Sequence, residues 1–131
     1  MRVPCVVWAP GRIQAGSDSD EMMSTIDLLP TLSALSGAKL KTKGPIDGLD
    51  QSALLLGKGS SARNEFLYYT REVQAIRQGN YKLRKTGNSM QLYDLIKDIG
   101  EKQNLAFQKP ELTQKLLARM NQLDQLSLIH I

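Results

Sequence analysis

Few residues in this sequence have side chains that could carry out chemistry by themselves. Cys5 is the single cysteine, and it lies in an apolar run, residues 3–8, with no adjacent acid, base or cation that could activate a thiol. We therefore predict that Cys5 is buried and structural, and a single cysteine cannot form an intrachain disulfide. The single histidine, His130, is the penultimate residue. The chain therefore cannot assemble a Ser-His-Asp or Cys-His catalytic site, or a metal site with several histidine ligands.

Two polar segments have a superficial likeness to ligand-binding loops. Residues 57–61, Gly-Lys-Gly-Ser-Ser, lack the spacing of a phosphate-binding loop and follow no clear strand, so we predict a flexible linker. Asp18, Asp20 and Glu21 could offer oxygen ligands to calcium, but they lack the central glycine and the ring of ligands of an EF-hand loop. We predict a solvated loop over residues 13–21. The sequence thus predicts no catalytic residue and no metal site, and it assigns no substrate-binding residue.

A denser polar set precedes the last predicted helix. Its members are Asp94, Asp98, Glu101 and Asn104. Short polar side chains of this kind accept hydrogen bonds from backbone amides at turns. We predict that this set caps turns and binds no ligand.

The composition is that of a globular protein with a modest positive charge. Hydrophobic residues make up 41% of the 131 residues and charged residues 23%, which excludes a disordered or collagen-like chain and permits one ordinary domain at most. Seventeen Lys and Arg against thirteen Asp and Glu give a net charge of +4. The basic residues concentrate in a predicted solvated loop, Lys39, Lys41 and Lys43, and along predicted solvated strand edges, Arg77, Lys82, Arg84 and Lys85. We therefore predict no dedicated nucleic-acid site.

The hydropathy pattern predicts no targeting or spanning segment. The longest apolar runs, residues 5–9 and 54–56, are too short for a membrane span. The first residues also lack the pattern of a secretory signal. Residues 126–131, Leu-Ser-Leu-Ile-His-Ile, no longer follow the stripe of the last helix, so we treat them as a candidate non-native tail.

Local patterns in the first half predict one strand and one main helix. The apolar run of residues 3–8 is typical of a strand covered on both faces. A helix should begin near Ser24, which has capping-box spacing to Asp27, and should end at Gly37. Its predicted packing face consists of Leu28, Leu32 and Leu35. Residues 38–48 are predicted to form a loop that ends in a turn at Asp47-Gly48, and residues 52–56 a short helical turn.

Beyond a flexible segment at residues 57–63, the pattern changes to short strands. Four strands are predicted over residues 65–70, 73–77, 81–85 and 90–95, with a tight hairpin at Gly79-Asn80 and another turn at residues 86–89. The last helix begins at Pro110. Its apolar stripe consists of Leu112, Leu116, Leu117, Met120 and Leu123. Together these elements predict an α+β arrangement, a four-stranded antiparallel sheet with a C-terminal helix.

Taken in order, several of these motifs resemble the C-terminal third of an arylsulfatase-type sulfatase. The motifs are Arg2-Val3-Pro4 with Trp8 and Pro10-Gly11; residues 24–32 with Gly37; Asp47-Gly48 with residues 54–57; residues 75–77 with Gly79 and residues 81–83; and residues 92–95 with Asp98, Glu101 and residues 104–106. One position departs from the pattern, because Ile99 stands where the family usually has proline.

The resemblance implies an alkaline-phosphatase-like α/β fold. Residues 1–57 would be the C-terminal end of the large sulfatase domain. Residues 58–125 would be a small antiparallel-sheet subdomain with its helix over residues 110–125. The family also implies a periplasmic or secreted location.

The resemblance further implies a sulfuric ester hydrolase that uses calcium and a formylglycine made from the first residue of a Cys/Ser-x-Pro-x-Arg motif. Cys5 does not match that motif, because Val7 stands where proline is needed and Ala9 where arginine is needed. In the family, the nucleophile and the metal ligands lie upstream of the segment that Arg2 begins. The expected partner is therefore the N-terminal catalytic portion of the same polypeptide, and the isolated chain is expected to be inactive.

Two other interpretations stay open at this point. A related phosphoester or phosphonate hydrolase would share the fold and differ in its upstream residues. A stand-alone basic binding module would need no upstream portion. Such a module would leave a strand over residues 3–8 as an exposed apolar edge, which is a liability for a soluble protein.

Overall fold

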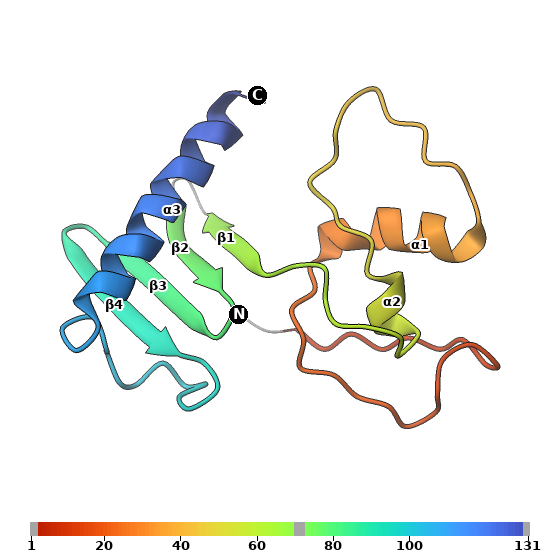
Figure 1. Cartoon of the computed structure of the whole chain (residues 1–131), viewed down its shortest axis with the longest axis horizontal. Helices are drawn as coiled ribbons and strands as arrows, with labels where there is room; N and C mark the ends of the chain where they lie inside the picture. The colour runs from red at the N-terminus through yellow and green to blue at the C-terminus, as the bar shows by residue number, and fades with distance from the viewer. Residues whose placement is uncertain (1–2, 70–72, 130–131) are drawn as a thin grey trace. The chain divides into compact units, whose positions relative to one another are not determined.

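The computed structural model describes residues 3–69 and 73–129, and the chain divides into two compact units, Met1–Arg63 and Asn64–Ile131. The first unit contains a 3-10 turn η1 (Thr25–Asp27) and the helices α1 (Leu28–Ser36) and α2 (Ser52–Leu55) (Figure 1). The second unit contains the strands β1 (Glu65–Tyr69), β2 (Val73–Gln78), β3 (Tyr81–Thr86) and β4 (Ser89–Asp94), and the helix α3 (Pro110–Ile129). The boundary between the units in the sequence follows Arg63, and the predicted division into domains between residues 57 and 58 stays a prediction.

The helical segment of the first unit begins and ends where its sequence predicts. The backbone N–H of Ser24 donates to Oδ2 of Asp27 at 2.9 Å, which is one half of the predicted capping box. Gly37 ends α1 in the left-handed conformation, with φ of 72°. A residue with a Cβ is strained at such a φ, so glycine suits this position.

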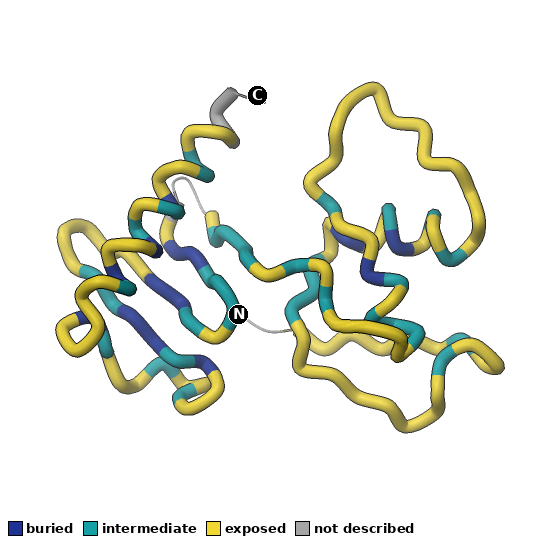
Figure 2. Tube along the Cα trace, viewed as in Figure 1, coloured by how far each residue is buried: buried dark blue, intermediate teal, exposed yellow. Residues whose placement is uncertain are grey.

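The packing face predicted for α1 is not buried within the described part of this chain, and of its three leucines only Leu35 is half-buried. Leu28 and Leu32 are 38% and 59% exposed, whereas Thr31 on the same helix is fully buried. Figure 2 shows this alternation along α1. The helix turns Asp27 and Thr31 inward because their polar atoms bind the backbone of residues 49–51. The interior of the first unit is therefore polar.

The strand predicted over residues 3–8 is wrong, and Cys5 is exposed instead of buried. Val6 and Trp8 are 93% and 85% exposed. A strand is held by hydrogen bonds to a neighbouring strand, and the described strands all belong to the sheet of the second unit. An apolar run in the sequence predicts burial, but a strand forms only where a neighbouring strand is available for hydrogen bonding.

The remaining elements of the first unit agree with the predictions. Residues 13–21 and 38–48 contain no helix or strand, and α2 lies where a short helical turn is predicted. Among the described residues, none of the helices combines the length and the apolar character that a membrane span requires.

The second unit is an antiparallel sheet with the strand order β1-β2-β3-β4 and with α3 alongside it (Figure 1). The four predicted strands and both turns are confirmed, although Thr70 at the end of the first strand lies outside the described residues. Gly79 and Gly87 have φ of 55° and 58° in the two hairpin turns. This left-handed backbone lets two-residue turns join twisted strands.

One apolar row crosses all four strands beneath α3. The register aligns Leu67, Ile76, Leu83 and Leu92 as successive neighbours. From α3, Leu116 and Met120 bury all but 1% of their surface against this row, and Leu112, Leu117 and Leu123 pack around them. The predicted stripe is therefore confirmed. The helix continues to Ile129, so the backbone of residues 126–129 remains helical, and residues 130–131 lie outside the described part.

Candidate functional site

The first unit encloses a cluster of polar side chains from separate segments. Asp27, Thr31 and Gln51 are fully buried, and the side chain of Arg63 is 9% exposed. With Ser61, these residues form what we call the polar cluster.

The carboxylate of Asp27 accepts hydrogen bonds from four residues, of which Gln51 donates through Nε2 at 3.5 Å. Nε of Arg63 lies 2.9 Å from Oδ2, and a terminal nitrogen of the same guanidinium lies 2.5 Å from Oδ1. The backbone N–H groups of Leu49 and Ser24 donate to the two oxygens at 2.8 Å and 2.9 Å. Arg63 also donates to the carbonyl oxygen of Asp47 at 2.8 Å. The planar guanidinium can donate two parallel hydrogen bonds to one carboxylate. The Arg63 side chain thereby links the end of the first unit to η1 and to the turn at Asp47.

Thr31, Gln51 and Ser61 extend the polar cluster. The Thr31 hydroxyl donates to the carbonyl oxygen of Asp27 at 2.6 Å and accepts the N–H of Gln51 at 2.9 Å. Oε1 of Gln51 accepts the N–H of Ala62 at 2.9 Å. The Ser61 hydroxyl donates to the carbonyl oxygen of Met22. Among the described residues, no buried side-chain nitrogen or oxygen lacks a partner, so this cluster is fully satisfied.

Burial and pairing act in opposite directions on the pKa of Asp27. Desolvation raises this pKa, but the hydrogen bonds from Arg63, Leu49 and Ser24 and the charge of Arg63 together lower it from 3.8 to about 2. Asp27 is therefore ionised at neutral pH and is a weak base. The polar cluster is suited to holding segments together and unsuited to proton transfer.

The residues that the sequence suggested as possible catalytic or metal-binding groups lie outside the polar cluster or at its edge. Cys5 is exposed, and Asp18 and Asp20 lie in an exposed loop. In the same loop, Oε2 of Glu21 accepts the N–H of Ser61 at 2.9 Å. Within residues 3–69 and 73–129, no group of three or more His, Cys, Asp and Glu could hold a metal ion. His130 lies outside the described residues.

The segment that superficially resembles a phosphate-binding loop has structural roles. The N–H groups of Gly57 and Lys58 donate to Leu54 and Ala53 at 3.0 Å and 2.8 Å and so end α2. Ser61, four residues further, belongs to the polar cluster. Residues 57–61 contain no helix or strand, as the linker prediction expects.

Three members of the polar set of the second unit accept backbone amides, as predicted, whereas the fourth, Glu101, instead pairs with Lys82. Asp94 accepts the N–H of Ile96, Asp98 accepts those of Lys102 and Gln103, and Asn104 accepts those of Leu92 and Ala106, over 2.7–3.1 Å. The N–H of Leu105 also donates to the carbonyl oxygen of Leu92 at 2.8 Å. Residues 104–105 therefore occupy the outer edge of β4, which blocks pairing with another chain at that point.

One basic residue predicted to be solvated is mostly buried. Lys82 is 9% exposed, and its Nζ lies 2.5 Å from Glu101 and 5.1 Å from the centre of the Tyr68 ring. The ion pair and the aromatic ring replace its hydration. Arg84 and Lys85 are exposed, as predicted, and Arg77 is half-buried.

Sequence reasoning missed the partners of Asp27. Asp27 and Thr31 are found as parts of a helix start, whereas Gln51 and Arg63 lie beyond the reach of any local pattern. Arg63 is 36 positions from Asp27 and ends a flexible segment. Only the fold brings the two side chains together.

Comparison with known proteins assigns the chain to a family. Residues 1–126 match the sequence model of the family described as N-sulphoglucosamine sulphohydrolase, C-terminal. The chain belongs to this sulphohydrolase C-terminal family. The resemblance to the C-terminal portion of sulfatases is thereby confirmed.

Curated relatives of this sulphohydrolase C-terminal chain are longer proteins. Arylsulfatase A of Bos taurus is 34% identical over 155 residues, which cover 96% of this chain and 30% of that protein. Steryl-sulfatase of Rattus norvegicus is 42% identical over 69 residues, which cover 53% of this chain and 12% of that protein. The chain thus spans less than a third of the length of these relatives.

Solved structures share the fold. Ps i-CgsB, solved in complex with k-i-k-neocarrahexaose, has a TM-score of 0.74 at 24% identity over 88% of this chain and 27% of its own. A 2-O GAG sulfatase has a TM-score of 0.52 at 28% identity over 76% of this chain and 23% of its own. The mixed α/β fold with its four-stranded antiparallel sheet and C-terminal helix is therefore that of sulfatase C-terminal regions.

Proposed function

We propose that this chain is the C-terminal portion of an arylsulfatase-like enzyme that hydrolyses sulfate esters, and that catalysis belongs to a preceding portion of the same polypeptide. The match of residues 1–126 to a C-terminal family carries this proposal. The 30% of arylsulfatase A that the chain spans supports it, because the larger part of such an enzyme lies outside the alignment.

The chemistry of the chain is consistent with this division of labour. Sulfate ester hydrolysis needs a strong nucleophile and cations directed at the sulfate oxygens. The Cys/Ser-x-Pro-x-Arg motif does not occur in the sequence, and Arg63 already neutralises Asp27, the best-enclosed carboxylate of the first unit. The residues of this chain thus do not fit a calcium site or a formylglycine, and we assign both to the preceding portion. The isolated chain would then be inactive.

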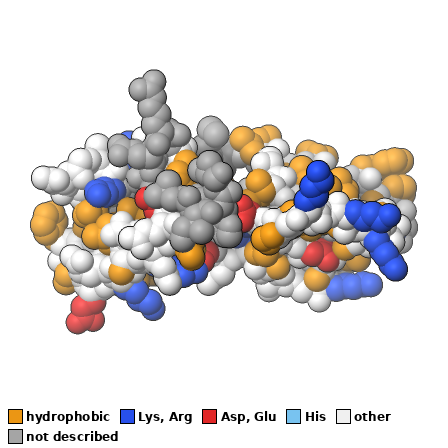
Figure 3. Space-filling view, turned by 90° about the horizontal axis from the view of Figure 1, so that it is seen from above, with side chains coloured by type: hydrophobic (Ala, Val, Ile, Leu, Met, Phe, Trp, Pro, Cys, Tyr) orange, Lys and Arg blue, Asp and Glu red, His pale blue; other side chains and the backbone are white. Residues whose placement is uncertain are grey.

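The surface of the first unit supports a structural role for this chain. Its buried residues are polar, while apolar side chains reach the surface (Figure 3). Those more than 40% exposed are Val3, Val6, Val7, Trp8, Ile26, Leu29 and Leu32. An apolar surface of this kind marks a contact with another protein segment. We propose that the preceding catalytic portion covers it.

The proposal is tested by assaying the purified chain with 4-nitrophenyl sulfate, with and without added calcium, beside the polypeptide extended upstream in frame. We expect no turnover by the chain and turnover by the extended polypeptide. Turnover of 4-nitrophenyl phosphate alone would favour the related phosphoester hydrolase. Turnover by the chain that a substitution within it abolishes would contradict the proposal.

The upstream sequence provides an independent test. It should continue in frame and encode a Cys/Ser-x-Pro-x-Arg motif and paired aspartates. A promoter and a ribosome-binding site directly before Met1, with no such motif upstream, would instead indicate a stand-alone binding module.

A further inference from the structure

The long connection between α1 and α2 contains a stretch of backbone that neither bends nor pairs (Figure 1). Residues 39–42 contain no helix, turn or bend, and none of the backbone–backbone hydrogen bonds found among the described residues involves residues 39–46. Lys39 and Lys41 lie in this stretch with exposed side chains, and Lys43 follows it in a bend. We call residues 39–42 the extended segment.

This backbone has the form in which a peptide enters the cleft of an endoprotease. Such a substrate binds as an extended strand whose main-chain groups pair with the enzyme, and exposed loops are preferred sites of cleavage. The ammonium group of a lysine fits a specificity pocket that has a carboxylate at its base. Lys39 and Lys41 therefore offer an accessible main chain and a recognisable side chain at the same positions, and neither is followed by proline.

Two exposed lysines of the second unit lack such a backbone. The N–H of Lys102 donates to Oδ2 of Asp98 at 2.7 Å. Lys97 lies in a turn that the N–H of Asp98 closes by donating to the carbonyl oxygen of Asp94 at 2.8 Å. A protease can bind these turns only after they open, which lowers the rate at which they are cut. The main chain, and not the charge, distinguishes the extended segment from these two lysines.

The hydrogen bonds of the polar cluster cross the extended segment. Asp27 and Thr31 precede it in the sequence, whereas Leu49, Gln51 and Arg63 follow it. A terminal nitrogen of Arg63 lies 2.5 Å from Oδ1 of Asp27. The N–H groups of Leu49 and Gln51 donate to Asp27 and Thr31 at 2.8 Å and 2.9 Å. Each of these bonds would join the two products of a cut in the segment.

Further contacts cross the segment in the same way. The N–H of Ser61 donates to Oε2 of Glu21 at 2.9 Å, and its hydroxyl donates to the carbonyl oxygen of Met22. Gly48 packs so closely against the backbone oxygen of Ile26 that a Cβ would collide with it. The first unit thus has contacts that can keep it assembled after its chain is cut.

We propose that the extended segment is a processing site at which a lysine-specific endoprotease cleaves the chain, and that the polar cluster then holds the two products together. Cleavage adds one water across the peptide bond that follows Lys39 or Lys41. The carbonyl carbon becomes a carboxylate, and the nitrogen leaves as an amine that takes up a proton. The inference goes beyond the proposed function, because it requires neither a sulfatase nucleophile nor the preceding catalytic portion.

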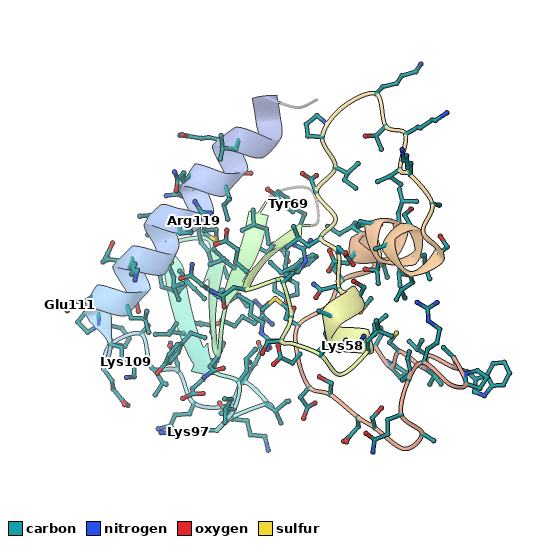
Figure 4. The ribbon with its side chains drawn as sticks, turned by 45° about the vertical axis from the view of Figure 1, so that its right-hand side comes forward. Lys58, Tyr69, Lys97, Lys109, Glu111 and Arg119 are labelled. Atoms are coloured by element: carbon teal, nitrogen blue, oxygen red, sulfur yellow. The ribbon has the colours of Figure 1, made fainter. Side chains whose placement is uncertain are left out.

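The test digests the full 131-residue chain with a lysine-specific endoprotease. All chains carry Lys58→Gln, which removes another exposed lysine of the first unit; Figure 4 labels Lys58. The loop variant also carries Lys39→Gln, Lys41→Gln and Lys43→Gln. A matched variant with the same net charge instead replaces three exposed lysines of the second unit, Lys97→Gln, Lys102→Gln and Lys115→Gln. Mass spectrometry identifies the cleaved bonds, and size-exclusion chromatography measures whether the products stay associated.

We expect cleavage in the extended segment to be at least about tenfold faster than cleavage after Lys97 or Lys102. The loop variant should resist cleavage, and the matched variant should be cut at the original rate. The products should elute as one species in buffer and separate in urea. The amide of Leu49, which donates across the cut to Asp27, should keep its NMR shift in the cleaved chain.

Two arginine variants test what holds the products together. Arg63→Gln removes an ion pair that crosses the segment. Arg12→Gln removes a hydrogen bond to the carbonyl oxygen of Leu35, which lies on the same product as Arg12. After cleavage, the Arg63→Gln products should separate and the Arg12→Gln products should stay together. If the Arg63→Gln chain is unfolded before cleavage, the Leu49 amide of the cleaved parent chain decides, because its shift is kept only while the polar cluster is intact.

Three outcomes would overturn the inference. The turns at Lys97 or Lys102 could be cut as fast as the extended segment. The products of the parent chain could separate in buffer or lose the Leu49 shift. The products of both arginine variants could also separate equally, which would show that the polar cluster does not hold them. A failed sulfatase assay affects none of these readouts.

Discussion

At the scale of single residues, the Asp27-Arg63 pair decides how the first unit is held together. Asp27 lies in η1 and accepts the backbone N–H of Leu49, while Arg63 donates to Asp27 and to the carbonyl oxygen of Asp47. Removing one partner of a buried pair leaves the other charge without compensation, which costs about 3–5 kcal/mol. The pair is therefore a structural requirement of the first unit, even though it has no catalytic task in this chain.

The lowered pKa of Asp27 predicts an unusual pH dependence. Its value in the folded state, about 2, lies below the ordinary 3.8, so the ionised carboxylate stabilises the fold above pH 3.8. This contribution, about 2 kcal/mol, is lost as the pH falls through that interval. We expect the NMR shift of the Leu49 amide, which donates to Asp27, to titrate with a midpoint near pH 2.

The Asp18→Asn variant supplies the control for this titration. Asp18 lies in an exposed loop, so its replacement should leave the transition at the Leu49 amide unchanged. A wild-type midpoint near 3.8 would show that Arg63 does not stabilise the carboxylate.

Gly48 predicts a second effect at a single position. A Cβ at this residue would collide with the backbone oxygen of Ile26, whereas a Cβ at Gly44 would meet nothing within 4 Å. Gly48→Ala should therefore separate the Asp47 turn from η1 and lower the free energy of unfolding by more than about 2 kcal/mol. Gly44→Ala should change it by less than about 0.5 kcal/mol. Hydrogen exchange over residues 47–51 measures the difference. Equal exchange in the two variants would refute the close approach.

At the scale of elements, the sheet and α3 form the apolar core that the first unit lacks. Leu116 and Met120 of α3 complete the row of Ile76, Leu83 and Leu92. The helix is also attached by an ion pair in which Arg119 donates to Glu65 of β1 at 2.5 Å and 3.0 Å; Figure 4 labels Arg119 on α3. The hydrogen bonds from Arg119 lower the pKa of Glu65. Packing is the larger contribution, because both partners of this ion pair are partly exposed and screened.

Leu116 and Leu32 form a matched pair for testing this contrast between elements. Leu116 is 1% exposed and Leu32 is 59% exposed. Leu116→Ala should cost about 2–5 kcal/mol of unfolding free energy, measured by urea titration with far-UV circular dichroism. Leu32→Ala should change it by less than about 0.5 kcal/mol. A comparable loss in both variants would mean that α1 buries its leucines in solution.

At the scale of the whole chain, the two units differ in what stabilises them. The first unit has a hydrogen-bonded polar interior and long irregular segments, whereas the second has a continuous apolar core. Segments with few buried apolar contacts open most readily. The first unit should therefore be the less protected part of the isolated chain.

Limited trypsin digestion, followed by mass spectrometry, checks this expectation. The first cleavages should follow Lys39, Lys41, Lys43 and Lys58, all exposed and outside helices and strands. Cleavage after Lys82 in β3 and Arg119 in α3 should come later, because both residues lie in the packed second unit. Early cleavage at these two sites would contradict the order of stability.

The sequence by itself determined the elements that depend on near neighbours. The strands β1–β4, their glycine turns, the stripe of α3 and the capping by Asp94, Asp98 and Asn104 follow from residues a few positions apart. The family order of motifs is likewise readable along the chain, and the match of residues 1–126 confirms it. Hydrophobic periodicity and turn-forming residues depend only on nearby positions, so they can be read from the sequence without knowledge of the fold.

Only the tertiary structure decided which side chains meet across long stretches of sequence. It paired Asp27 with Arg63 and buried Thr31 and Lys82. It left Cys5, Leu28, Leu29 and Leu32 exposed. Each of these outcomes depends on a partner that is distant in sequence or on the lack of a neighbouring strand in the described part of the chain. Burial is a property of the assembled neighbours, and a side chain's own polarity predicts it only when those neighbours are present.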